Sequence, residues 1–79
     1  MSPTIIRFKG YRFYFFSREE KRKHVHVSCP EGEAKFWLEP QIILCENHRI
    51  PARKLNEITK FIGEKKNEII SAWQEHFSG

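Results

Sequence analysis

The sequence has little cysteine and no long apolar stretch. Its two cysteines, Cys29 and Cys45, are too few for a disulfide scaffold and match no paired zinc-ligand spacing. No apolar run approaches the ~18 residues of a membrane span, and the N-terminus lacks the basic and then apolar order of a signal peptide. We therefore expect a soluble, cytoplasmic protein with reduced thiols, no membrane contact and no cofactor.

The chain is also too short to bury more than one hydrophobic core. Its 79 residues predict a single domain spanning residues 1–79. Aromatic residues make up 14% of the sequence, and large rings bury much area per residue. A compact core can therefore form without disulfides or a structural metal.

Polar and apolar residues alternate before residue 51, which predicts strands. We expect strands at 4–8, 11–16, 23–29 and 34–39, and a further short strand at 42–45. Gly10 marks a bend, residues 17–23 form an exposed hairpin loop, and residues 46–49 form a polar turn. In the turn Pro30-Glu31-Gly32, the glycine is expected to accept the left-handed conformation.

The hydrophobic period changes to about 3.6 at Pro51, which suits a first helical turn. The apolar residues of one helix face are Leu55, Ile58, Ile62, Ile69, Trp73 and Phe77. Gly63 falls inside this pattern and costs about 1 kcal/mol relative to alanine, so either one bent helix or two shorter helices would fit. We favour one, because no proline or cluster of turn residues interrupts residues 59–77.

These patterns predict an α+β fold. An antiparallel meander of four to five strands, mainly in residues 1–50, should pack against one long C-terminal helix, mainly in residues 51–77. The expected contacts join Val25, Val27, Phe36 and Leu38 of the sheet to Ile58, Ile62, Ile69 and Trp73 of the helix.

Positive charge gathers at the N-terminal end. The net charge is +4, and residues 1–23 hold seven Lys and Arg against two Glu, a net +5. Such a cluster attracts polyanions and acidic proteins, although the run from Arg18 to Lys23 also fits a solvated loop tip. Aromatic residues interleaved with Arg12 resemble the combination that binds single-stranded nucleic acid, and an outward-facing Trp37 indicates an interface. The candidate contact residues are Arg12, Arg18, Lys21, Arg22, Lys23, His24, His26 and Trp37.

The segment His24-Val25-His26-Val27 places two imidazoles on one strand face, roughly 6.5–7 Å apart along the chain. Four interpretations stay open: an exposed or half-buried polar face, a ligand or partner contact, general acid–base chemistry on RNA, and metal binding. A third metal ligand would have to come from His48, His76, Glu33 or Cys29. Since the sequence names none, we assign no metal, and His24 and His26 remain only candidates for catalysis.

Several segments carry a family resemblance. They are Pro3-Thr4-Ile5, Arg7-Phe8, Gly10 and its strand, His24-Val25-His26-Val27, Glu33-Ala34, Ile50-Pro51 and Trp73. In order and spacing this chain resembles the small bacterial proteins grouped as domain of unknown function family 4160. Members usually have two prolines where Arg22 and Lys23 stand here, often a tryptophan at the place of Phe61 and a histidine at the place of Lys65. The resemblance implies a gene beside another small gene, in an arrangement like a toxin–antitoxin pair.

Two functions are consistent with these observations. The first is a small basic binding module, one component of a bacterial two-gene regulatory or toxin–antitoxin-like system, which acts through the product of the adjacent small gene, nucleic acid or both. The alternative is a small ribonuclease-type toxin that uses His24 and His26 as general acid and base. The sequence favours the non-enzymatic function and leaves the oligomeric state open.

Overall fold

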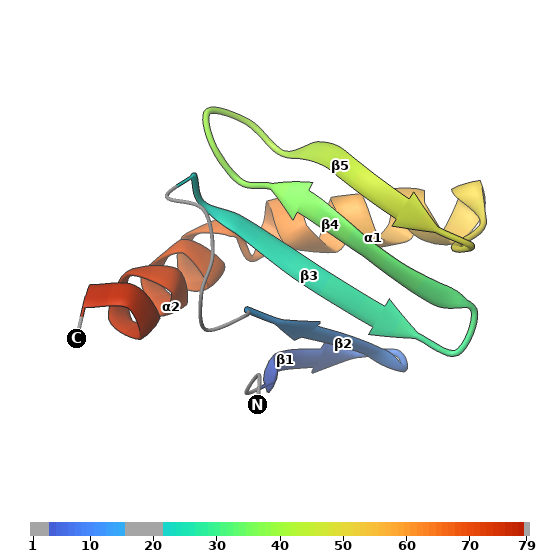
Figure 1. The fold of residues 1–79 in the computed structure, drawn as a ribbon, viewed down its shortest axis with the longest axis horizontal. Helices are drawn as coiled ribbons and strands as arrows, with labels where there is room; N and C mark the ends of the chain where they lie inside the picture. Colours follow the sequence, from blue (N-terminus) through green and yellow to red (C-terminus); the bar gives the residue numbers. More distant parts are fainter. Residues whose placement is uncertain (1–3, 16–21, 79) are drawn as a thin grey trace.

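The computed structural model describes residues 4–15 and 22–78 and has the expected α+β architecture (Figure 1). Five antiparallel strands form one sheet in the order β1-β2-β3-β4-β5. The strands are β1 (Thr4–Phe8), β2 (Tyr11–Tyr14), β3 (His24–Cys29), β4 (Gly32–Trp37) and β5 (Ile43–His48). Two helices follow, α1 (Ala52–Glu64) and α2 (Lys66–Ser78).

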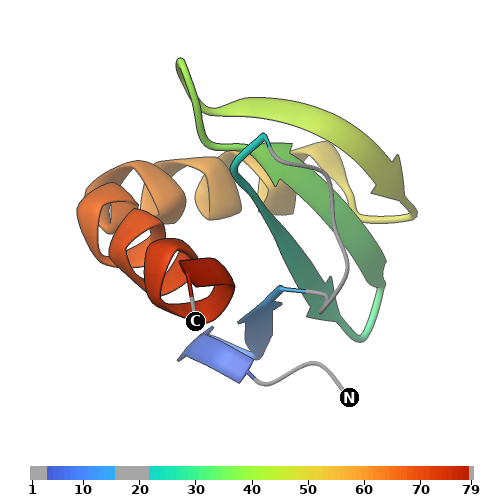
Figure 2. The same cartoon turned by 60° about the vertical axis from the view of Figure 1, so that its left-hand side comes forward.

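Both helices lie on the same side of the sheet (Figure 2). The core between the two layers contains all the predicted contact residues, which are Val25, Val27, Phe36, Leu38, Ile58, Ile62, Ile69 and Trp73. Tyr11, Phe13 and Phe15 join them from the N-terminal hairpin. Phe61 is buried as well, and its ring stacks on that of Phe8 with the centroids 4.0 Å apart. Apolar burial on one face of the sheet thus holds the two layers together.

The prediction of one long C-terminal helix is wrong. The helix is interrupted at Lys65, whose φ of −109° and ψ of 16° lie outside the helical range. Gly63, just before the break, weakens the end of α1. The change of direction lets Trp73 of α2 reach the end of the sheet, where its ring lies 5.4 Å from Phe15. Neither α1 nor α2 is long and apolar enough to cross a membrane.

The predicted polar turn at residues 46–49 is also wrong, because β5 continues to His48. Most of β5 is exposed, so no apolar alternation marks it in the sequence; pairing with β4 holds it instead. The chain turns afterwards, at Arg49, whose φ is 74°. There the Asn47 side chain bonds both backbone groups of Ile50, at 3.0 and 3.1 Å.

Glycine is needed at two positions for different structural reasons. Gly10 (φ 83°) follows Lys9 (φ 48°) in a two-residue hairpin loop, where positive φ at both positions matches the twist of the strands. Gly32, contrary to the sequence prediction, does not have a positive φ. A Cβ at Gly32 would overlap the carbonyl oxygen of His48 in β5. Close approach of two strands therefore requires this glycine.

A small polar network joins the first hairpin to α1. The Tyr11 hydroxyl donates to Glu57 Oε1 at 2.8 Å, and Lys9 Nζ donates to Oε2 at 3.1 Å. The bond from Tyr11, and secondly that from Lys9, holds the pKa of Glu57 below its usual value. Burial, and then the bond to Glu57, raises the pKa of Tyr11 to about 12.

Replacing Tyr11 by phenylalanine should raise the pKa of Glu57 toward its ordinary value, because the strongest donor is lost. A carboxyl whose folded pKa is depressed stabilises the fold above its unfolded pKa, and this contribution disappears as the pH falls through the folded pKa. Tyr11→Phe should therefore weaken the acid dependence of stability. NMR titration of the Glu57 carboxyl measures the shift, and Lys9→Met should move it less. An unchanged Glu57 titration in Tyr11→Phe would contradict the network.

Candidate functional site on the open face of the sheet

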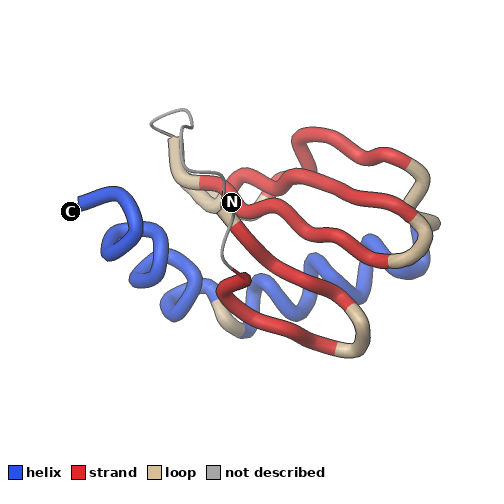
Figure 3. The backbone as a smooth tube through the Cα atoms, turned by 60° about the horizontal axis from the view of Figure 1, so that its bottom comes forward, coloured by secondary structure: helices blue, strands red, loops and turns tan. Residues whose placement is uncertain are grey.

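Both helices lie against one side of the sheet and leave the other side uncovered (Figure 3). We call it the open face. Strand register places its members in three cross-strand rows, Arg7-Arg12-Ser28-Glu33-His48, Tyr14-His26-Lys35-Glu46 and Trp37-Ile43. Residues far apart in sequence thus become neighbours on one surface.

Trp37 lies on the open face, opposite the buried Phe36 and Leu38, as its alternation in the sequence predicts. Two positively charged side chains lie beside its half-buried ring. Arg22 Cζ lies 4.3 Å from the ring centroid and Lys35 Nζ lies 4.6 Å from it. Arg22 also donates from Nε to the carbonyl oxygen of Glu39, at 3.1 Å. One edge of the open face therefore combines an aromatic ring with two positive charges.

A second aromatic group lies across β2 and β3. The His26 ring stacks on Tyr14 with centroids 5.4 Å apart and planes at 20°, and Arg12 Cζ lies 4.6 Å from the Tyr14 centroid. Burial, followed by the charge of Glu33, raises the pKa of Tyr14. These contacts fix the orientation of His26.

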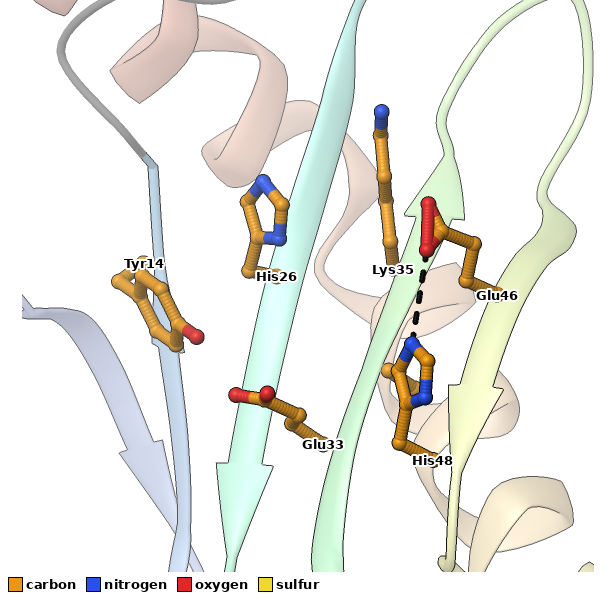
Figure 4. Close-up of a pocket in the computed structure, with 7 residues that line it drawn as sticks. Tyr14, His26, Glu33, Lys35, Glu46 and His48 are labelled. Atoms are coloured by element: carbon orange, nitrogen blue, oxygen red, sulfur yellow. Dashed lines mark ion pairs between the residues drawn. The ribbon is translucent and has the colours of Figure 1, made fainter.

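A pocket of about 280 Å³ opens on the open face beside Tyr14 and His26 (Figure 4). Its lining residues are Tyr14, His26, Glu33, Ala34, Lys35, Glu46 and His48. His26 comes from β3 and His48 from β5, and β4 between them supplies Glu33 and Lys35. His48 Nε2 lies 3.5 Å from Glu46 Oε1, the pair marked by the dashed line. Both imidazoles, a lysine and two carboxylates thus border the same space.

His24 does not share that space. Its ring is a neighbour of His26, as expected, with centroids 5.3 Å apart, but His24 is fully buried. The prediction of an exposed or half-buried pair is therefore wrong for His24, because Trp73 of α2 covers it at 4.8 Å. Nδ1 lies 2.7 Å from the carbonyl oxygen of Arg22, and since a carbonyl only accepts, Nδ1 is the donor.

The remaining predicted contact residues do not all lie on the open face. Arg12 and Arg22 lie on the open face, whereas Lys23 forms an ion pair with Glu39 at 3.2 Å. Arg18 and Lys21 lie outside the described residues. Within residues 4–15 and 22–78, no three His, Cys, Asp or Glu side chains gather as metal ligands. Of the proposed third ligands, His76 lies in α2 and packs against Phe15 instead.

Sequence reasoning missed several members of the open face. These are Arg7, Lys35 and Glu46 as contact residues, and also His48, which the sequence offers only as a possible third metal ligand. Only the register between β3, β4 and β5 brings the last three to the pocket. Treating residues 46–48 as a strand would have placed Glu46 and His48 on one face, because their spacing is two.

The comparisons with known proteins give one finding. The model of the family described as "Domain of unknown function (DUF4160)" matches residues 10–74. No curated protein and no solved structure matches the chain. The matched segment runs from the first hairpin turn into α2, and so it contains the pocket and Trp37. The chain therefore belongs to the DUF4160 family, as its ordered motifs predicted.

Proposed function

We propose that this protein is a binding module for single-stranded nucleic acid, RNA foremost, and that the open face is its binding surface. The observation that carries the proposal is the position of Trp37, an outward ring with the cations of Arg22 and Lys35 beside it. Proteins that bind single strands combine a ring on which a base stacks with positive charges that follow the phosphates.

The energies favour a base over the two cations as the occupant of the Trp37 ring. A cation–π contact at an exposed site is worth about 0.5–1 kcal/mol. Stacking of a base on an aromatic side chain is worth about 1–3 kcal/mol. A base can therefore displace one cation from the ring. The displaced Arg22 or Lys35 then lies next to the phosphates on either side of that base.

Arg7 and Arg12 support the proposal from the other end of the open face. They are directly opposite each other in the pairing of β1 with β2. Like charges in that position destabilise a sheet. A phosphate bound between the two guanidinium groups would replace the repulsion between the arginines by attraction. It would also accept two charge-assisted hydrogen bonds.

A second candidate function is favoured by the edge of the sheet. Among the described residues, Ile43 and Leu44 of the edge strand β5 are the large apolar side chains that stay exposed, at 42% and 41%. An exposed edge of this kind accepts an additional strand from a partner protein. We propose the product of an adjacent small gene as that partner, in a cytoplasmic bacterial two-gene system of the toxin–antitoxin type.

Fluorescence of Trp37 tests the leading proposal. Trp73→Phe leaves Trp37 as the only tryptophan, and titration with a ~10-nucleotide single-stranded RNA should quench its emission, because a stacked base contacts the indole directly. The matched variant Trp37→Phe keeps only the buried Trp73, whose emission should stay constant. RNA binding that leaves Trp37 emission unchanged, or quenches Trp73 equally, would contradict the proposed surface.

A further inference from the structure

We propose that the pocket bordered by His26, Lys35 and His48 cleaves the RNA that the open face holds, an inference that rests on the proposed function. The two imidazoles come from different strands, β3 and β5, and border one pocket of about 280 Å³. Lys35 projects from the strand between them (Figure 4). In this arrangement His48, and not the buried His24, is the second histidine beside His26.

The pocket contains the groups that phosphodiester cleavage requires. Cleavage within RNA needs one group that takes a proton from the ribose 2′-hydroxyl and another that gives a proton to the leaving oxygen; imidazole can do either near neutral pH. It also needs a positive charge where negative charge develops on the phosphate oxygens. His26, His48 and Lys35 can supply these three functions from three adjacent strands.

Neighbouring side chains contact both imidazoles. Tyr14 stacks on His26 at 5.4 Å, and the Glu46 carboxylate lies 3.5 Å from His48 Nε2. Positioning of this kind is what makes acid–base catalysis efficient, because the proton must travel along a defined line. His26 and His48 thus have the supporting contacts expected of an acid–base pair.

The reaction balances without any co-reactant. One imidazole, in its neutral form, accepts the 2′-hydroxyl proton while the 2′-oxygen attacks the adjacent phosphorus. A 2′-O–P bond forms and the bond from phosphorus to the 5′-oxygen breaks. The other imidazole, in its protonated form, gives its proton to that 5′-oxygen. The products are a 2′,3′-cyclic phosphate and a 5′-hydroxyl.

The plot of cleavage rate against pH should be bell-shaped, because one imidazole must be neutral while the other is protonated. Other titratable or charged groups face the pair: Tyr14 and Arg12 from β2, His24 from β3, Glu33 and Lys35 from β4, and Glu46 from β5. The rising and falling limbs of the pH profile therefore reflect the titration of these groups together and not of single residues.

Cleavage of an end-labelled single-stranded RNA by the purified protein tests the inference. His26→Gln and His48→Gln should each slow cleavage by about 10²-fold or more, while RNA affinity from fluorescence anisotropy changes by less than about threefold, since neither imidazole is needed for stacking or charge. His76→Gln on α2 should cleave at the normal rate. One 2′-deoxyribose at the cleaved position should prevent cleavage there and leave binding intact.

The outcomes separate this inference from the proposed function. RNA that is bound but never cut overturns the ribonuclease site and leaves the binding function standing, whereas absence of RNA binding overturns both. Cleavage that survives the His26→Gln, His48→Gln double variant overturns the assignment. So does cleavage that stops with a chelator and leaves 3′-hydroxyl ends. Cyclic phosphate ends that disappear in both single variants support it.

Discussion

Replacing Arg12, Arg22 and Lys35 together by glutamate should lower the affinity for single-stranded RNA by about 10²-fold or more at ~0.1 M salt. Each cation that contacts a phosphate releases a counterion, so each contact adds about 0.7 to the slope of log affinity against log salt for a single strand. The triple variant should therefore bind weakly and lose about 2 from this slope. Anisotropy titrations at several salt concentrations measure both quantities.

A matched variant separates the surface from the overall charge. Arg53, Lys60 and Lys66 lie on the helices, on the other side of the molecule from the open face. Their replacement by glutamate changes the net charge from +4 to −2, as the first variant does. Affinity should fall far less in this control. Equal losses in the two variants would mean that diffuse charge, and not the open face, attracts the nucleic acid.

Gly32→Ala should destabilise the fold by about 3 kcal/mol, the upper end of what added atoms cost in a packed site. The new Cβ would overlap the His48 carbonyl oxygen, which belongs to the backbone of β5 and cannot rotate away. Either β5 shifts and loses pairing with β4, or the hairpin at Pro30-Glu31 deforms. Urea unfolding of the purified variant gives the change in free energy.

Gly63→Ala is the matched control, and its effect should have the opposite sign. Gly63 lies inside α1, and the nearest side-chain atom to an added Cβ would be Ile42 Cδ1 at 3.9 Å, an ordinary contact. Alanine there should stabilise the protein by about 0.5–1 kcal/mol through its helix propensity. If both substitutions proved neutral, the close approach of β4 and β5 would be refuted.

The sequence predicts well those parts of the fold in which burial imposes a period. Ala34, Phe36 and Leu38 alternate with less buried neighbours because β4 has one core face, and helical spacing begins after Pro51 because α1 covers that face. Trp37 could therefore be placed on the outer surface from the sequence alone. The family resemblance is likewise readable in the sequence, because it rests on the order and spacing of short motifs.

Features that depend on how elements meet could not be predicted in this way. His24 alternates like an exposed residue, but the ring of Trp73 on α2, together with those of His26 and Trp37, buries it. The second half of β5, residues 46–48, has no buried period, so it could not be told from a turn, although a strand is expected from the sequence at 42–45. His26 and His48 reach the same pocket because of the register of β3, β4 and β5, which includes a bulge opposite Lys35 and Phe36. Registers are set by three-dimensional packing and are not visible in local patterns.

The central claim is that the open face binds single-stranded nucleic acid, and amide and indole NMR signals recorded during an RNA titration test it most directly. We expect the Trp37 indole N–H and the amides of Arg12, His26 and Lys35 to shift together with one dissociation constant. Signals of Arg53 and Lys60 on α1 should stay in place. Shifts confined to the helices, or to the β5 edge alone, or no shifts at low salt, would contradict the claim.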